Sequence, residues 1–347
     1  LLAIFIANGV IARGLMSAAD SFFAKADALI DEGVAQPEIA IASGSPGSSI
    51  EWDTIGRRGK NFIVEGPQES DLTEFWGREC LQPVRVYVGL RSRDSIEARA
   101  KLALEELIRV DGFKRSTLIV ATPTGTGWLD PAAVDSVEYL LEGDTAIVSM
   151  QYSYLPSWLT IIVDPTRSIV ASQVLFDEIY DYWLTLPADD RPKLYLFGLS
   201  LGAFGSEVSA DLYKVFDDPI QGAVWSGPPF PSTQWQESTR ERNEDSPAWS
   251  PRFRNGSMVR FTSQENTLES GKPWGEMRNV YVQYASDPMV FFSPDLAFQK
   301  PAWLGGQRGP DVSPHLKWYP VVTFLQIAFD LPMATSVPNG YGHNYSP

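Results

Sequence analysis

Only one cysteine, Cys80, and two histidines, His315 and His343, occur among the 347 residues. A single cysteine excludes an intrachain disulfide and a thiolate metal cluster, and two histidines in separate segments leave few ligands for zinc. Basic residues are scarce too, since 28 Lys and Arg stand against 43 Asp and Glu, for a formal net charge of −15. A chain with this excess of negative charge is poorly suited to bind the phosphate backbone of a nucleic acid. We therefore expect no nucleic-acid partner, no bound metal and no cofactor.

The chain also opens without an uncharged run long enough to span a membrane. The opening segment, LLAIFIANGVIARGLM, is uncharged only as far as Ala12, whereas a membrane-spanning helix needs about 20 apolar residues. It also lacks the basic first segment of a signal peptide. Two interpretations stay open for a helix over residues 1–35: an amphipathic helix packed on the domain, or the end of a membrane helix whose upstream part is absent. The Gly/Ser/Pro-rich segment Ala42–Ile50 predicts a boundary, which gives an N-terminal helical arm (1–45) and a main domain (46–347).

Apolar residues are plentiful, at 44% with 12% aromatic, which is typical of a globular chain. Apolar runs of strand length are expected at Lys60–Gly66, Pro83–Leu90, Ser116–Pro123, Thr145–Tyr154, Lys193–Gly198, Gly222–Gly227, Asn279–Ser286 and Leu316–Pro320. Helical spacing predicts helices at Asp94–Val110, Asp130–Gly143, Ser168–Leu186, Ala203–Phe216 and Val321–Leu331. This alternation favours an α/β fold, with a mostly parallel central sheet covered by helices on both faces.

The alternation breaks between residues 228 and 278. This stretch is rich in Pro, Ser, Arg and Trp, with Trp235, Trp249 and Trp274. An irregular insertion of this length inside a compact domain is usually functional. It predicts a lid over a pocket, with a solvated surface excursion as the alternative.

The stretch LYLFGLSLGAFG places Ser200 between Gly198 and Gly202, after a strand and before a helix. That context is the one a nucleophile elbow needs. Glycines without a β-carbon let neighbouring elements approach closely there, and the amide of Leu201 at the start of the helix faces a developing oxyanion. The alternative is a structural serine in an ordinary turn.

A serine hydroxyl is a poor nucleophile until a base takes its proton. His343 lies in a Gly/Pro-rich loop near the chain end, VPNGYGHNYSP, and such loops carry catalytic groups. We therefore favour it over His315, which we expect to be a surface or structural histidine. Asp287 ends the apolar segment NVYVQYAS and is followed by Pro288, so its carboxylate can orient the imidazole. The order Ser200, Asp287, His343 is that of the α/β-hydrolase architecture.

Two points of this assignment have alternatives. Asp287 is otherwise an Asp-Pro turn residue, with the acid supplied by Asp295, Asp311 or Asp330. A second oxyanion amide is expected from the loop ATPTGTGWLD, at Thr124 or Gly125, unless this loop is a plain turn before a capped helix. The loop does not fit a phosphate loop or a dinucleotide fingerprint.

Six stretches together resemble a known family: PVRVYVGL, TPTGTGWLDP, EYLLEGDTAIVSMQYSYLPSWL, GLSLGAFG, SDPMV and GYGHNY. They are similar to a bacterial membrane-linked α/β-hydrolase family found in actinobacteria, from about Ser49 to the end. The resemblance implies Ser200 as nucleophile, Asp287 as acid and His343 as base. It also implies that the N-terminal segment is the remainder of a membrane connection. The family's helix after the histidine loop is expected to be missing or trimmed, because only four residues follow His343.

These features predict a serine hydrolase that cleaves carboxylic esters with lipidic or other apolar acyl groups, through an acyl-enzyme. The partner would be a small-molecule or lipid ester. The place would be the bacterial cell membrane, reached through the N-terminus, with the catalytic part itself soluble. An acyltransferase with the same triad and a non-catalytic binding module of the same fold are the alternatives. The sequence leaves the oligomeric state and the membrane side open.

Overall fold

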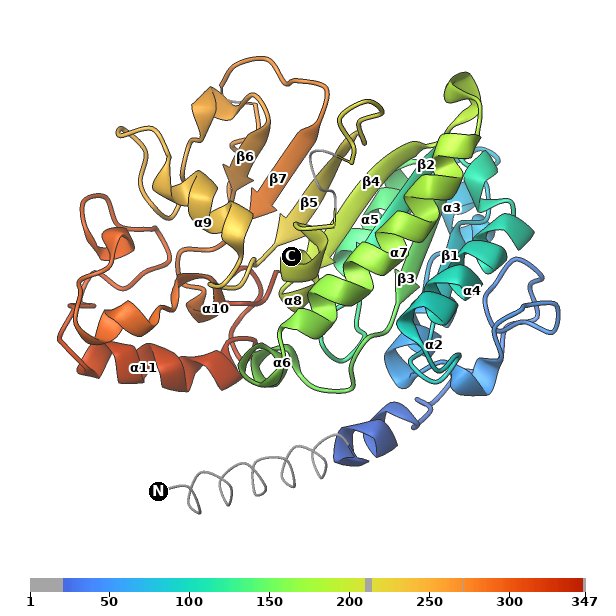
Figure 1. The fold of residues 1–347 in the computed structure, drawn as a ribbon, viewed down its shortest axis with the longest axis horizontal. Coiled ribbons are helices and arrows are strands. Elements are labelled where there is room, and N and C mark those ends of the chain that lie inside the picture. The colour runs from blue at the N-terminus through green and yellow to red at the C-terminus, as the bar shows by residue number, and fades with distance from the viewer. Residues whose placement is uncertain (1–20, 210–213, 270, 346–347) are drawn as a thin grey trace.

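The computed structural model describes residues 21–209, 214–269 and 271–345 (Figure 1). Its centre is a sheet of seven strands in the order β1-β3-β2-β4-β5-β7-β6. Every neighbouring pair is parallel. The strands are β1 (Val84–Val88), β2 (Thr117–Thr122), β3 (Thr145–Met150), β4 (Lys193–Leu199), β5 (Gly222–Ser226), β6 (Val259–Thr262) and β7 (Arg278–Val282). The predicted α/β fold with a parallel sheet is confirmed.

The continuous apolar strands need cover on both faces. Every residue of β1, β2 and β3 is buried, as expected of parallel strands between two layers of helix. The helices are α2 (Arg57–Val64), α3 (Glu69–Trp76), α4 (Ile96–Arg109), α5 (Pro131–Leu140), α6 (Ser157–Val163), α7 (Thr166–Thr185), α8 (Leu201–Ser206), α9 (Thr233–Arg240), α10 (Pro288–Phe291) and α11 (Val322–Asp330). In Figure 1, α4, α7 and α8 lie in front of the sheet and α5 lies behind it.

Parallel strands bring their carboxyl ends to one edge of the sheet, which is the lower edge in Figure 1. The loops after β2, β4, β5 and β7 therefore meet there. Ligands of open α/β sheets bind outside this edge. The fold thus places the segments that hold the predicted site residues in one region.

Two predicted strands are wrong. Lys60–Gly66 overlaps α2. It was predicted as a strand because its apolar run is only a few residues long, and such a run does not distinguish a strand from a helix. The buried positions of α2 follow a helical spacing, and Gly59 packs against the ring of Tyr87. Leu316–Pro320 forms no strand; instead the Trp318 indole donates to the carbonyl of Leu296 at 2.9 Å.

The insertion over 228–278 is less irregular than its composition suggests. It contains α9 and also β6, which pairs with β7 and forms the edge of the sheet. β6 has only four residues and two of them are only partly buried, so its sequence carries little strand signal. The helix predicted over Ala203–Phe216 is the shorter α8 within the described residues, and residues 210–213 lie outside them.

The predicted N-terminal helix falls partly on residues 1–20, which lie outside the described residues. Residues 21–27 are helical, so the described part of this helix ends before residue 35. The arm is tied to α2 because the Asp31 carboxylate accepts from Arg57 Nε and Asn61 Nδ2 at 2.9 and 2.8 Å. The segment Ala42–Ile50 packs on the domain, where the Ser48 hydroxyl donates to Glu106 at 2.6 Å. No helix in the described part of the chain is long and apolar enough to cross a bilayer.

Candidate active site

Ser200 is the single residue between β4 and α8, and its backbone is strained. Its φ of 57° and ψ of −124° lie in a region that residues with a side chain rarely adopt. A β-carbon at Gly198 would clash with the backbone of Gly202, and one at Gly202 would clash with the carbonyl of Thr122. Both glycines are therefore required by close approach of the backbone. The turn buries Ser200, whose exposed fraction is 2%.

Asp287 and His343 form a buried pair. Oδ2 of Asp287 lies 2.7 Å from Nδ1 of His343, and the residues are 1% and 8% exposed. Oδ1 of Asp287 accepts from the amide of Met289 at 2.8 Å, so the same carboxylate caps α10. An ionised carboxylate only accepts, so Nδ1 carries the proton and Nε2 of the neutral ring keeps a free lone pair.

Gly227 connects this pair to Ser200. The amide of Ser200 donates to the carbonyl of Ser226 at 2.8 Å, at the end of β5. The next residue, Gly227, lies against the His343 ring, because a β-carbon there would come within 2.7 Å of Cε1. The three predicted residues are therefore brought to one place by the ends of β4, β5 and β7.

Two polar atoms at this place are buried without a partner. Within the described residues, neither Ser200 Oγ nor His343 Nε2 has a hydrogen-bond partner. Most buried polar atoms in proteins are hydrogen-bonded, so an exception calls for an explanation. A nucleophile and a base that receive their partner only when substrate binds would have this arrangement.

The predicted oxyanion loop lies beside the elbow, since Gly202 packs against the carbonyls of Thr122 and Pro123. The amide of Thr124 donates to the carbonyl of Trp128 at 2.9 Å. The amide of Gly125 donates to Oγ of Ser157 at 3.1 Å. Leu201 is the first residue of α8, and an amide at that position has no acceptor inside its helix.

Sequence reasoning missed several residues that hold this region. Tyr345 donates to Oδ2 of Asp287 at 2.7 Å. The Ser286 hydroxyl donates to Asp311 at 2.6 Å and accepts from the amide of Gly342 at 2.9 Å, which ties the aspartate loop to the histidine loop. The sequence offers little signal for these contacts, because they join residues far apart in the chain. His315 is exposed, as expected.

Glu207, just after α8, is a second buried carboxylate. It accepts from the Tyr281 hydroxyl at 2.8 Å and from the amide of Gln234 at 3.3 Å, near the start of α9. Burial raises its pKa to about 7, against the opposing effect of these hydrogen bonds. Glu207 thus joins the helix behind Ser200 to the insertion.

A groove of about 730 Å³ lies between α9 and the segment after α10. That volume is in the range of small-molecule sites. Aromatic rings line much of it: Phe230, Trp235, Phe291, Phe292 and Trp303. It adjoins the catalytic candidates through the chain, since the amide of Phe230 donates to the carbonyl of Met289 at 2.8 Å. The insertion therefore lines a groove through α9.

Comparison with known proteins agrees with this architecture. A model of the alpha/beta-hydrolase family matches residues 84–347, and a model of that family's N-terminus matches residues 1–67. No curated protein matches the chain.

Three solved structures are similar to parts of the chain. An acetylxylan esterase is 12% identical with a TM-score of 0.29, and the match covers 51% of this chain and 85% of that one. A metagenome-derived lipolytic enzyme is 9% identical with a TM-score of 0.25, over 50% and 85%. A yden-like hydrolase from Pectobacterium atrosepticum is 14% identical with a TM-score of 0.23, over 53% and 83%.

Proposed function

The chain belongs to the alpha/beta-hydrolase family, and from that membership we propose that it is a serine hydrolase that cleaves carboxylic esters. The observation that carries the proposal is the buried Asp287–His343 pair, 2.7 Å apart, beside a serine held at a φ of 57°. An ordinary turn needs neither a serine at positive φ nor a buried imidazole nitrogen that has no partner among the described residues.

The proposed mechanism has two steps. Ser200 Oγ attacks the ester carbonyl while His343 Nε2 takes its proton, and the imidazolium then gives that proton to the leaving alcohol. The product is an acyl-enzyme, which water hydrolyses with His343 again acting as base. Asp287 holds the ring in the tautomer that leaves Nε2 free and stabilises its charged form.

The tetrahedral intermediate needs donors for its oxyanion. The amide of Leu201 is the first, because it opens α8. For the second we favour Gly125 over Thr124. Its present acceptor is the Ser157 hydroxyl, which can rotate away, whereas Thr124 is committed to a main-chain carbonyl in its own turn.

An apolar acyl group is the proposed substrate feature. The aromatic groove beside α10 supports it, since its volume of about 730 Å³ would accommodate an alkyl chain. We propose that the alkyl chain of the substrate lies against Trp235 and Phe291 while its ester group reaches Ser200.

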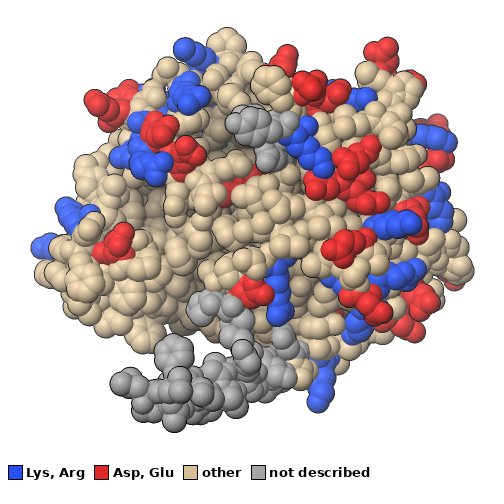
Figure 2. Space-filling view, in the orientation of Figure 1, with Lys and Arg blue, Asp and Glu red and all other residues tan. Residues whose placement is uncertain are grey.

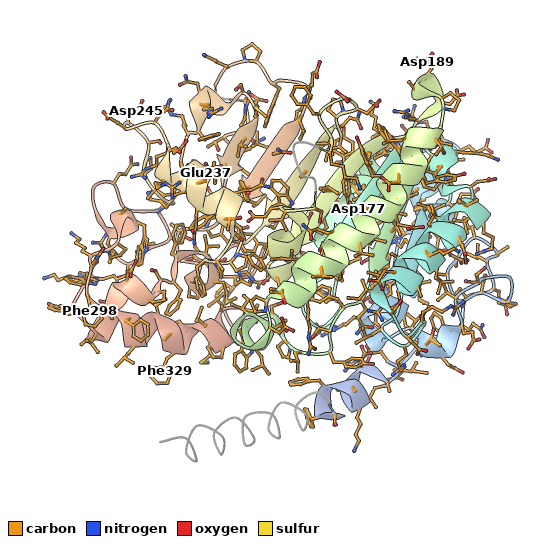
Figure 3. The ribbon with its side chains drawn as sticks, viewed as in Figure 1. Asp177, Asp189, Glu237, Asp245, Phe298 and Phe329 are labelled. Atoms are coloured by element: carbon orange, nitrogen blue, oxygen red, sulfur yellow. The ribbon has the colours of Figure 1, made fainter. Side chains whose placement is uncertain are left out.

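We also propose that the protein is membrane-linked, of the type found in actinobacteria, and acts at a lipid surface. The outer face of α11 supports this, because Val322, Leu325 and Phe329 are exposed on it rather than buried. Phe298 lies at the same side of the molecule, where Figure 2 has few charged side chains and Figure 3 has both phenylalanines at the outer edge. From residue 318 to the end, the sequence has one charged side chain, Asp330.

Labelling with a fluorophosphonate tests the proposed function. We expect the wild type to be labelled, and Ser200→Ala and His343→Ala to lose labelling by a factor of about 10³ or more. His315→Ala is the matched control, since it removes the exposed histidine and should label like the wild type. Labelling that survives Ser200→Ala, or a folded wild type that is not labelled, would contradict the proposal.

A further inference from the structure

Among the residues that the structure describes, three groups donate to the Asp287 carboxylate. Met289 supplies its amide to Oδ1, and this bond belongs to the cap of α10. Nδ1 of His343 and Oη of Tyr345 both lie 2.7 Å from Oδ2. Two donors therefore share Oδ2, the oxygen that faces the imidazole. One of them, Tyr345, has no part in a Ser-His-Asp arrangement.

The direction of the Tyr345 hydrogen bond is fixed by its neighbours. The amide of Tyr284 donates to Oη of Tyr345 at 3.3 Å, so the phenol proton is left to point at the carboxylate. Burial, followed by the nearby charge of Asp287, raises the pKa of Tyr345 well above its usual value. The phenol therefore stays protonated and remains a donor throughout the pH range of an assay.

Packing also holds the Tyr345 ring in place. It stacks on Tyr284 with the ring centres 4.5 Å apart and an angle of 16° between the planes. It meets the His343 ring edge-on, at 5.6 Å and 89°. Gly227 lies under both, because a β-carbon there would come within 2.6 Å of Tyr345 Cε2 and 2.7 Å of His343 Cε1. A side chain fixed on three sides is suited to positioning its hydroxyl accurately.

We propose that Tyr345 is a positioning residue that holds the Asp287 carboxylate in line with His343 and lowers the negative charge on the oxygen they share. The inference rests on the serine hydrolase function proposed above. A hydrogen bond to the charged form of a carboxylate stabilises that charge and weakens its attraction for a neighbouring proton. Without the phenol, Asp287 would stabilise the imidazolium more strongly, and His343 would act as base only at higher pH.

The test removes only the hydroxyl. In Tyr345→Phe we expect the acidic limb of kcat/KM for a soluble ester to move up by roughly half a unit to one pH unit, a threefold to tenfold change in proton affinity. Tyr284→Phe is the matched control, since it removes a hydroxyl from the other ring of the stack, and only the main-chain amide of Tyr284 bonds to Tyr345. A Tyr345 that served only for packing would lower the rate evenly at all pH values.

The other titratable groups around the pair are the same in both variants. Asp311 accepts from Ser286 next to Asp287, and the charges of Asp311 and Asp130 are near Tyr284. Asp330 lines a pocket together with Ser286 and Pro288. A shift of the acidic limb that occurs only in Tyr345→Phe is therefore caused by the loss of the phenol hydroxyl. Profiles that superimpose after scaling, or an equal shift in Tyr284→Phe, would overturn the inference.

A second measurement does not depend on activity. The chain has only two histidines, so NMR titration of the ¹³C-histidine-labelled chain reports His343 directly, with the exposed His315 as internal reference. We expect the His343 midpoint to rise in Tyr345→Phe and to be the same in Asp287→Asn with and without that change. A shifted midpoint in a chain that hydrolyses no ester would keep this inference and reject the proposed function. An unshifted His343 midpoint in an enzyme that hydrolyses esters would reject this inference and keep the proposed function.

Discussion

Gly227 lies so close to His343 that a β-carbon on it would come within 2.7 Å of Cε1 of the imidazole. Its φ is +54°, which also favours glycine. We predict that Gly227→Ala displaces the ring from Ser200 and lowers kcat/KM by about 100-fold, because a misplacement near 1 Å is enough for that loss. Ester hydrolysis measured beside a thermal melt checks the prediction.

The matched control for this change is Gly340→Ala. Gly340 also has a positive φ, +80°, and lies in the histidine loop, but a β-carbon on it would meet nothing within 4 Å. Gly340→Ala should therefore have the same kind of backbone strain as Gly227→Ala and a modest loss of stability, but it should keep the wild-type activity. Equal losses of activity in the two variants would mean that backbone strain, and not contact with the imidazole, explains the effect.

The buried carboxylate of Glu207 predicts a pH-dependent stability. Its pKa is raised from an ordinary 4.5 to about 7, first of all by burial. Between these values the folded state binds a proton that the unfolded state has lost, so its stabilising contribution is present below pH 4.5 and is lost as the pH rises through 7. We predict that Glu207→Gln gains roughly 2–3 kcal/mol relative to the wild type between pH 5 and pH 8. Urea denaturation at both pH values measures this.

Glu237→Gln is the control for that prediction. Glu237 is exposed on α9 (Figure 3), so the same chemical change there should not alter the pH dependence of unfolding. If Glu207→Gln tracks the wild type at both pH values, Glu207 does not carry its proton at neutral pH. Its hydrogen bonds to Tyr281 and α9 would then outweigh its burial.

The sequence was enough to predict six of the seven strands and to propose the residues of the candidate triad, and the reason is local in each case. The pattern Gly198-x-Ser200-x-Gly202 indicates a turn that requires glycines on both sides of the serine, and Asp287-Pro288 indicates the start of a helix. Such features leave a signature within a few residues. The catalytic roles of these residues stay a prediction.

Features made by contacts across the chain were not predictable. Tyr345 reaches Asp287 over 58 positions, and Glu207 reaches Tyr281 over 74. The edge strand β6 was missed because it has four residues and depends on pairing with β7. Lys60–Gly66 was misjudged because a short apolar run fits a buried helix as well as a strand.

The aromatic groove predicts a dependence on acyl chain length. Ala302 lines the groove and is exposed to it, so Ala302→Trp should fill part of the space. We expect kcat/KM to fall at least about tenfold for a dodecanoate ester and to change little for an acetate, since each methylene contributes about 0.8 kcal/mol when buried. Ala188→Trp is the control, at an exposed alanine that does not line the groove and lies just before the amino end of β4. Equal effects on both esters would place the acyl chain elsewhere.

The outer face of α11 predicts binding to a lipid surface. Phe298 and Phe329 are 79% and 74% exposed, and both lie at the outer edge in Figure 3. We expect the chain to sediment with zwitterionic phosphatidylcholine vesicles, and the double variant F298S/F329S to bind at least about tenfold more weakly, because burying one phenylalanine contributes about 1.5–3 kcal/mol. Adding anionic lipid should weaken binding, since the net charge is −15.

Phe216→Ser distinguishes binding by the outer face of α11 from binding by exposed apolar area in general. Phe216 is 75% exposed but precedes the amino end of β5, away from α11. If removing it weakens vesicle binding as much as F298S/F329S does, exposed apolar area alone drives the binding and α11 has no special part. If only the double variant loses binding, the face that meets the lipid is the one along the carboxyl edge of the sheet. The ester of a membrane-bound substrate would then approach Ser200 from the side where the strands end.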